Sequence, residues 1–102
     1  MYEINGVTWY IKFIPPHSPI FKMDNGQYTI GVCDNYTKTI YLSNNLIGNL
    51  LRKVLCHEIV HSAMFSYDIW LNYEQEEILA DLIATYGSEI ISITNKIFKK
   101  LQ

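Results

Sequence analysis

Cysteine, long apolar stretches and excess positive charge are what this chain has least of. Its 102 residues include two cysteines, too few for the disulfide framework of a small secreted domain. The apolar runs fall short of the roughly 18 residues that span a bilayer, and the start at Met1–Asn5 has no basic segment followed by an apolar one. The net charge of −2 gives no basic stripe for nucleic acid. We therefore expect a soluble, cytoplasmic protein that does not bind DNA or RNA by itself and does not enter a membrane.

The chain does contain enough apolar surface for one core, since 49% of its residues are hydrophobic. No internal repeat or low-complexity segment is present. The first part is rich in β-branched and aromatic runs and the second follows helical spacing, an order typical of an α+β fold. We predict a single domain over residues 1–102, with a sheet region at 1–45 and a helical region at 46–102.

The predicted sheet has three or four strands and is antiparallel or mixed. The pair Asn5-Gly6 is a type I′ turn signal, so the runs on either side of it should form a hairpin. The predicted strands are Tyr2–Ile4, Val7–Ile14, Gln27–Cys33 and Thr39–Leu42. The last one leads almost directly into the first helix. We expect it to form the edge of a cleft, where an extended peptide can pair with it.

Three helices are predicted after the sheet. The first covers Leu46–Phe65, which lacks proline and carries apolar residues on one face. The second begins with a capping-box variant at Asn72–Gln75 and ends before Gly87, a helix stop signal. The third covers Ser88–Leu101 and is expected to be an ordinary packing helix, with lysines that suit its C-terminal dipole.

The most informative pattern is H-E-x-x-H, formed by His57, Glu58 and His61. Positions i and i+4 of a helix share one face, so both imidazoles can point at one ion. Glu58 lies about 100° round the helix, off the ligand face but within reach of water at the metal. The pattern indicates a zinc site in which the histidines bind the metal and Glu58 moves protons.

A catalytic zinc site needs a third protein ligand and an open position for water. His17 is a candidate, but it lies in a proline-rich loop where no spacing supports it. Asp68 is another candidate. In the extended motif H-E-x-x-H-x-x-G-x-x-H, an aspartate variant would have its last ligand at position 67, so Asp68 lies one residue too far along. Met64 also occupies the position of the turn glycine of that motif. Both are weak candidates.

Glu77 is the better third ligand. Glu77 and Asp81 form E-x-x-x-D, which places both carboxylates on one face of the second helix. Asp81 could then accept a hydrogen bond from the free ring nitrogen of His57 and fix its tautomer. The neighbouring acids, Glu74 and Glu76, are expected only to complement the N-terminal dipole of that helix.

The sequence H-E-I-V-H, followed by a helix with E-I-L-A-D, resembles the gluzincin clan of zinc peptidases. The helix spacing and the preceding strand resemble the ImmA/IrrE family of small bacterial and phage metallopeptidases. The resemblance covers roughly Thr39–Ser88, and Asp81 stands where that family commonly has asparagine. It implies a minimal zincin fold, peptidase activity, and zinc held by His57, His61 and Glu77.

These features predict a zinc metallopeptidase that hydrolyses a protein substrate, typically a repressor in the family it resembles. Glu58 would be the general base, taking a proton from water activated at the zinc and passing it to the leaving amine. We expect a protein or peptide as the partner and a monomer as the oligomeric state. The alternative left open is a structural zinc domain, or a degenerate peptidase fold that binds a partner protein without catalysis.

Overall fold

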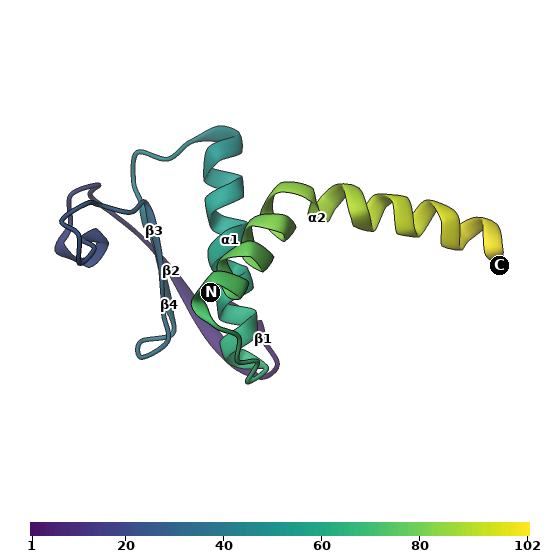
Figure 1. Ribbon diagram of the computed structural model, residues 1–102, viewed down its shortest axis with the longest axis horizontal. Coiled ribbons are helices and arrows are strands. Elements are labelled where there is room, and N and C mark those ends of the chain that lie inside the picture. The colour runs from purple at the N-terminus through teal and green to yellow at the C-terminus, as the bar shows by residue number, and fades with distance from the viewer.

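The computed structural model describes every residue from Met1 to Gln102 and has an α+β fold with one sheet and two helices. Helix α1 lies against the sheet, and α2 crosses α1 before running away from the rest of the molecule (Figure 1). The elements in chain order are β1 (Tyr2–Ile4), β2 (Val7–Ile14), the one-turn 3-10 helix η1 (Pro19–Phe21), β3 (Gly31–Asp34), β4 (Thr39–Ser43), α1 (Gly48–Ser66) and α2 (Tyr73–Leu101).

The four strands form a mixed sheet in the order β1-β2-β4-β3. β1 and β2 make the predicted hairpin, and its turn residues Asn5 and Gly6 have φ values of 48° and 78°, the positive values that a type I′ turn requires. β2 pairs in parallel with β4, whereas β4 and β3 are antiparallel. The sheet region thus has the expected number of strands.

Two predictions about the later strands are wrong. The strand predicted at Gln27–Cys33 is confined to Gly31–Asp34, because the chain before it makes a tight turn closed by a single bridge between Lys22 and Tyr28. The strand predicted at Thr39–Leu42 exists, but it is not an edge. β4 is bonded on one side to β2 and on the other to β3, so the edge strands are β1 and β3, and β3 is the edge beside β4.

The prediction of three helices after the sheet is also wrong, because the second and third are one continuous helix. α2 runs for 29 residues and begins with the predicted capping box between Asn72 and Gln75. Gly87 lies inside it with an ordinary helical backbone. A glycine in a helix interior costs only about 1 kcal/mol relative to alanine, which good helix formers on both sides outweigh.

The core is small and holds α1 in place from two sides. Ile40 and Leu42 of β4 are fully buried, and partly buried residues of α1 pack against them. Val60 and Met64 of α1 form a second cluster with Ala80 of α2. Because apolar contacts fix α1 against both neighbours, residues on its remaining face have a defined position relative to β3 and α2.

The C-terminal part of α2 projects from the body of the molecule, which is formed by the sheet, α1 and the first turns of α2 (Figure 1). The molecule is 52 Å long but only 29 by 27 Å in the other directions. Every residue from Ser88 to Gln102 is exposed. Neither helix has both the length and the apolar character that crossing a membrane requires.

Candidate metal centre

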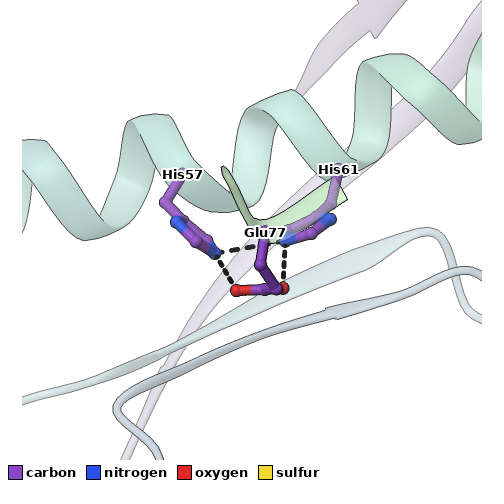
Figure 2. A group of neighbouring side chains, drawn as sticks. All are labelled: His57, His61 and Glu77. Carbon is purple, nitrogen blue, oxygen red and sulfur yellow. Dashed lines mark hydrogen bonds and ion pairs between the residues drawn. The ribbon is translucent and has the colours of Figure 1, made fainter. Parts of the chain in front are cut away.

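Two histidines of α1 and a glutamate of α2 meet beside the crossing of the two helices (Figure 2). The Nε2 atoms of His57 and His61 are 3.1 Å apart. Glu77 places Oε2 3.2 Å from Nε2 of His57, and Oε1 3.0 Å from Nε2 of His61. The structure therefore brings together the three residues predicted as ligands, with their ligand atoms within 4.8 Å of one another.

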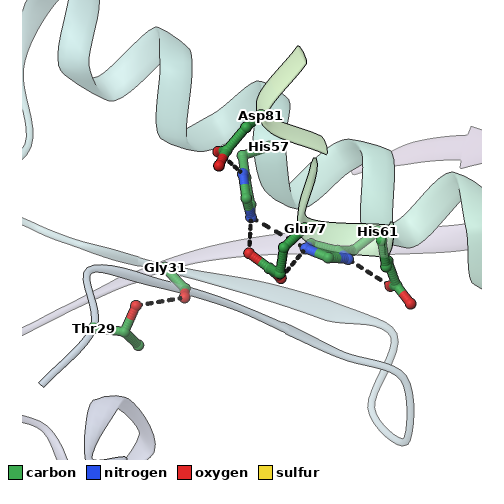
Figure 3. A network of polar contacts seen from close by, with 7 residues as sticks. Thr29, Gly31, His57, His61, Glu77 and Asp81 are labelled. Atoms are coloured by element: carbon green, nitrogen blue, oxygen red, sulfur yellow. Dashed lines mark hydrogen bonds and ion pairs between the residues drawn. The ribbon is translucent and has the colours of Figure 1, made fainter. Parts of the chain in front are cut away.

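Each histidine is held from behind by a carboxylate of α2 (Figure 3). Nδ1 of His57 lies 2.9 Å from Oδ1 of Asp81, and Nδ1 of His61 lies 2.6 Å from Oε1 of Glu76. An ionised carboxylate only accepts hydrogen bonds, so both Nδ1 atoms carry a proton and donate it. In a neutral imidazole the other nitrogen then has a lone pair, and both lone pairs point toward Glu77.

This donor set is compatible with a metal ion. Two nitrogen lone pairs and a carboxylate converge at spacings of 3.0 to 3.2 Å, and such groups repel one another unless positive charge lies between them. When the ligand distances of a tetrahedral site are about 2.0–2.1 Å, neighbouring ligand atoms are about 3.3 Å apart. The observed spacings are close to this value. Because the two distances to Glu77 end on different oxygens, the spacings show only that the three residues lie close enough together to hold one metal ion.

Glu58 lines the same cleft but takes no part in the contacts that hold the two histidines. The residue is only 7% exposed. Burial raises the pKa of its carboxyl above the ordinary value, while the imidazoles of His57 and His61 lower it and the carboxylate of Glu77 raises it. A carboxylate with a raised pKa is a stronger base than an exposed one. The arrangement therefore places a buried carboxyl group beside the candidate ligand cluster.

Space for the Glu58 side chain depends on Gly31 in β3. A Cβ atom at Gly31 would lie 3.1 Å from Oε2 of Glu58 and 2.8 Å from Cγ1 of Val54. Both distances are shorter than ordinary van der Waals contacts, so any other residue would push β3 away from α1 or displace Glu58. Nothing in the sequence pattern singled out this glycine, because the close approach arises between segments far apart in the chain.

The cleft is an open groove of about 450 Å³ beside β3 and the two helices. Its hydrophobic lining residues are Met23, Val32, Cys33, Phe65 and Tyr73. Burial raises the pKa of the Cys33 thiol, and the nearby Glu58 carboxylate raises it further. This thiol therefore stays protonated and does not act as a thiolate ligand or nucleophile.

The backbone of β3 offers free hydrogen-bonding groups along this groove. The N–H of Ser43 donates to the carbonyl of Ile30 at 3.0 Å, so Ile30 points its backbone polar groups toward β4. Successive residues of an antiparallel strand point these groups alternately toward and away from the partner strand. Gly31 and Cys33 therefore turn their N–H and C=O groups away from β4, toward the open edge. The carbonyl of Gly31 receives only a long bond of 3.4 Å from Oγ1 of Thr29 (Figure 3).

The other ligand candidates lie elsewhere. The ring of His17 packs edge-on against Tyr28, with the ring centroids 5.1 Å apart. Asp68 has a φ of 56° after the end of α1 and accepts a hydrogen bond of 2.6 Å from Nε1 of Trp70. Neither belongs to the cluster that Glu77 completes.

Glu76 does more than complement the N-terminal dipole of α2, because its carboxylate also contacts His61. Its side chain is 22% exposed and contacts His61, whereas Asp81, behind His57, is 66% exposed. Metal-binding histidines generally donate their second N–H to a carboxylate or carbonyl, and this rule predicts a partner for His61 as well as for His57. Which acid serves depends on how α1 and α2 cross, and sequence spacing does not specify that. Glu74 stays exposed in the first turn, as expected.

The two supporting carboxylates should differ in their effect on metal affinity. Loss of such a partner typically costs about 10- to 100-fold. We expect Glu76→Ala to lie near the upper end and Asp81→Ala near the lower end, because water screens the hydrogen bond of the exposed Asp81. Competition with a chromophoric chelator measures both affinities. An equal loss in the two variants, or a larger one for Asp81→Ala, would contradict this ranking.

Comparisons of this chain with protein-family models, curated proteins and solved structures find no match. The site is described by its own residues. It has three candidate ligands, a carboxylate behind each histidine, and Glu58 unengaged in the same cleft.

Proposed function

We propose that this protein is a zinc-dependent peptidase that hydrolyses peptide bonds of a protein substrate. The observation that carries the proposal is the placement of His57, His61 and Glu77 around one point, with the buried Glu58 carboxylate in the same cleft. The resemblance of H-E-I-V-H and E-I-L-A-D to the ImmA/IrrE family supports it. On the basis of that resemblance, we propose that the substrate is a regulatory protein such as a repressor.

Zinc is the metal that this donor set favours, because two imidazoles and one carboxylate are ligands typical of catalytic zinc. Three protein ligands leave one tetrahedral position open, whereas structural sites are closed by four. Zinc bound there would supply a Lewis acid that acidifies water and polarises a carbonyl. The carboxylates of Asp81 and Glu76 would keep both Nε2 lone pairs directed at it.

Glu58 is the proposed general base. Its carboxylate would accept a proton from the attacking water and deliver it to the amine that leaves when the peptide bond breaks. Burial of the side chain favours both transfers, because it raises the pKa of the carboxyl toward that of the groups with which it exchanges the proton. Gly31 contributes by leaving room for this carboxylate beside β3.

We propose that the substrate binds as an added strand along β3, in place of the predicted role of Thr39–Leu42. The outward N–H and C=O groups of Gly31 and Cys33 are suited to pair with an extended peptide. β3 also passes close to Glu58 at Gly31, where a Cβ atom would lie 3.1 Å from Oε2. A peptide bond held at Gly31 would therefore lie beside the proton acceptor.

The alternative is a zinc domain that is structural, or one that binds a partner without catalysis. Such a domain would need neither an open coordination position nor a buried carboxylate outside the ligand set. Burying Glu58 costs stability, since burial disfavours its charged form. A costly ionisable group in a cleft is more typical of catalytic sites, and this observation favours the peptidase.

Metal removal tests the proposal. The zinc-loaded protein should cleave members of an unstructured peptide library, and cleavage should stop when a chelator removes the metal. Added Zn²⁺ should restore cleavage and Mg²⁺ should not, because imidazole ligands suit zinc and Mg²⁺ prefers oxygen. Mass spectrometry of the new termini measures the outcome. Stoichiometric zinc binding without cleavage of the library, or of candidate repressors, would favour the non-catalytic alternative.

A further inference from the structure

The projecting part of α2 carries an apolar face that nothing in the chain covers. Eight large apolar side chains between residues 83 and 101 are each between 38% and 76% exposed: Ile83, Tyr86, Ile90, Ile91, Ile93, Ile97, Phe98 and Leu101. A compact chain of this length has a radius of gyration of about 13 Å, whereas this one has 15.3 Å. The difference comes from this helix, which leaves the body instead of folding back onto it (Figure 1).

The spacing of these residues is that of a helix-pairing seam. Ile83, Ile90 and Ile97 recur every seven residues, at the positions called a in a heptad. Tyr86 and Ile93 fall between them at d, three residues after one isoleucine and four before the next. A stripe of this kind is buried when a second helix lies along it.

The charges beside the stripe indicate a second copy of the same helix, in the opposite direction. Glu89 and Lys96 lie on one flank of the stripe, at g, and two g flanks face each other when helices pair antiparallel. With Ile90 of one copy opposite Ile93 of the other, Glu89 of each copy comes beside Lys96 of its mate. A parallel pair would instead place Glu89 beside Thr94, with no ion pair.

We propose that two copies of this chain form a symmetric dimer by antiparallel pairing of the α2 helices over residues 83–101. The two-fold axis passes between the two helices at the level of residues 91 and 92, and both copies use the same surface. This assignment is independent of the proposed function, and it replaces the expectation of a monomer. The predicted separate helix at Ser88–Leu101 thereby becomes the dimerisation segment of α2.

A groove on the body supports the antiparallel arrangement. It has a volume of about 340 Å³, lies between α1 and α2, and is lined in part by Arg52, Ala84 and Gly87. In the antiparallel register, Phe98 and Leu101 of the second copy lie level with residues 85 and 82, beside this groove. The small residues in its wall leave room for these side chains, so the end of each helix would rest against the body of the other copy.

The area that such a pair would bury is sufficient for a stable dimer. The five seam side chains, together with Phe98 and Leu101, expose roughly 100 Å² each, judged from the size of such residues. Pairing two copies would then remove about 1,400 Å² from water, which is within the range of a specific interface. No additional partner is needed to cover the face.

Sedimentation equilibrium of the 102-residue chain, with matched variants of the exposed helix, tests the dimer. We expect the wild type to be dimeric at micromolar concentration. Ile90→Asp should raise the dissociation constant by about 100-fold, because it places a charge in the seam. Asn95→Asp, in the same segment but on the face opposite the seam, should leave it unchanged. Circular dichroism confirms that each variant retains its helices.

Charge exchange tests the direction of the helices without disturbing the apolar stripe. Glu89→Lys and Lys96→Glu should each raise the dissociation constant by about tenfold, since each variant creates two like-charge contacts. The double variant should return to within about threefold of the wild type, because both ion pairs re-form with reversed sign. Failure of the double variant to recover overturns the antiparallel pairing. A wild type that stays monomeric, including one that instead binds phospholipid vesicles, overturns the dimer.

Discussion

Replacement of Glu58 by glutamine should abolish peptidase activity while leaving metal binding nearly unchanged. Loss of a general base typically costs about 10²- to 10⁴-fold in rate, and glutamine cannot accept the proton. The metal should remain because Glu58 is outside the ligand cluster of His57, His61 and Glu77. Initial rates of peptide cleavage at saturating zinc, together with the zinc content of the purified variant, measure the two effects separately.

A matched control separates the role of Glu58 from a general effect of removing a carboxylate. Glu74→Gln removes an exposed acid from the first turn of α2 and should change neither rate nor zinc content. The metal-free Glu58→Gln protein should also unfold at a higher temperature than the metal-free wild type, since it has no charge to bury. A variant that cleaves at the wild-type rate would contradict the assignment of Glu58 as the base.

The second large effect is expected at the third ligand. Glu77→Ala should lower zinc affinity by more than about 100-fold, because loss of a supporting residue behind a ligand already costs about 10- to 100-fold. Its two oxygens lie 3.2 Å and 3.0 Å from the Nε2 atoms of His57 and His61, so no other carboxylate is placed to substitute for it in that position. Competition titration with a chelator of known affinity gives the change.

Two further variants make the result at Glu77 specific. Asp68→Ala should bind zinc like the wild type, since Asp68 contacts Trp70 outside the cluster. Glu77→Asp should recover part of the affinity, because it restores the carboxylate on a shorter side chain. If Glu77→Ala kept wild-type affinity, the ligand set would have to be revised, and with it the proposal of an open catalytic position.

The local parts of the site could be predicted from the sequence alone. His57 and His61 share a helix face because of the 3.6-residue turn, and the same periodicity aligns Glu77 with Asp81. The hairpin at Asn5-Gly6 and the capping box of α2 are equally local, and both are present. In each case the prediction needs only residue types and spacing within one turn or one helix.

Contacts between distant segments limited the prediction of the rest. The sequence predicts the wrong strand as the edge of the sheet, because the parallel pairing of β2 with β4 joins segments that no spacing rule connects. Spacing along α2 predicts only a helix-dipole role for Glu76, whereas the crossing of α1 and α2 brings its carboxylate to His61. Gly87 predicts a helix end, but a single glycine does not outweigh the helical preference of the residues on both sides of it.

Helix periodicity predicts His57 and His61 as metal ligands and Glu58 as a proton acceptor, because it fixes their relative positions before any tertiary contact forms. The packing of distant segments brings Glu77 to both histidines, places Glu76 behind His61, and makes Gly31 the residue that leaves room for Glu58. The two kinds of contact differ in their separation along the chain. Backbone geometry sets the spacing within one helix, whereas packing of the whole core sets the distance between a helix and its neighbours.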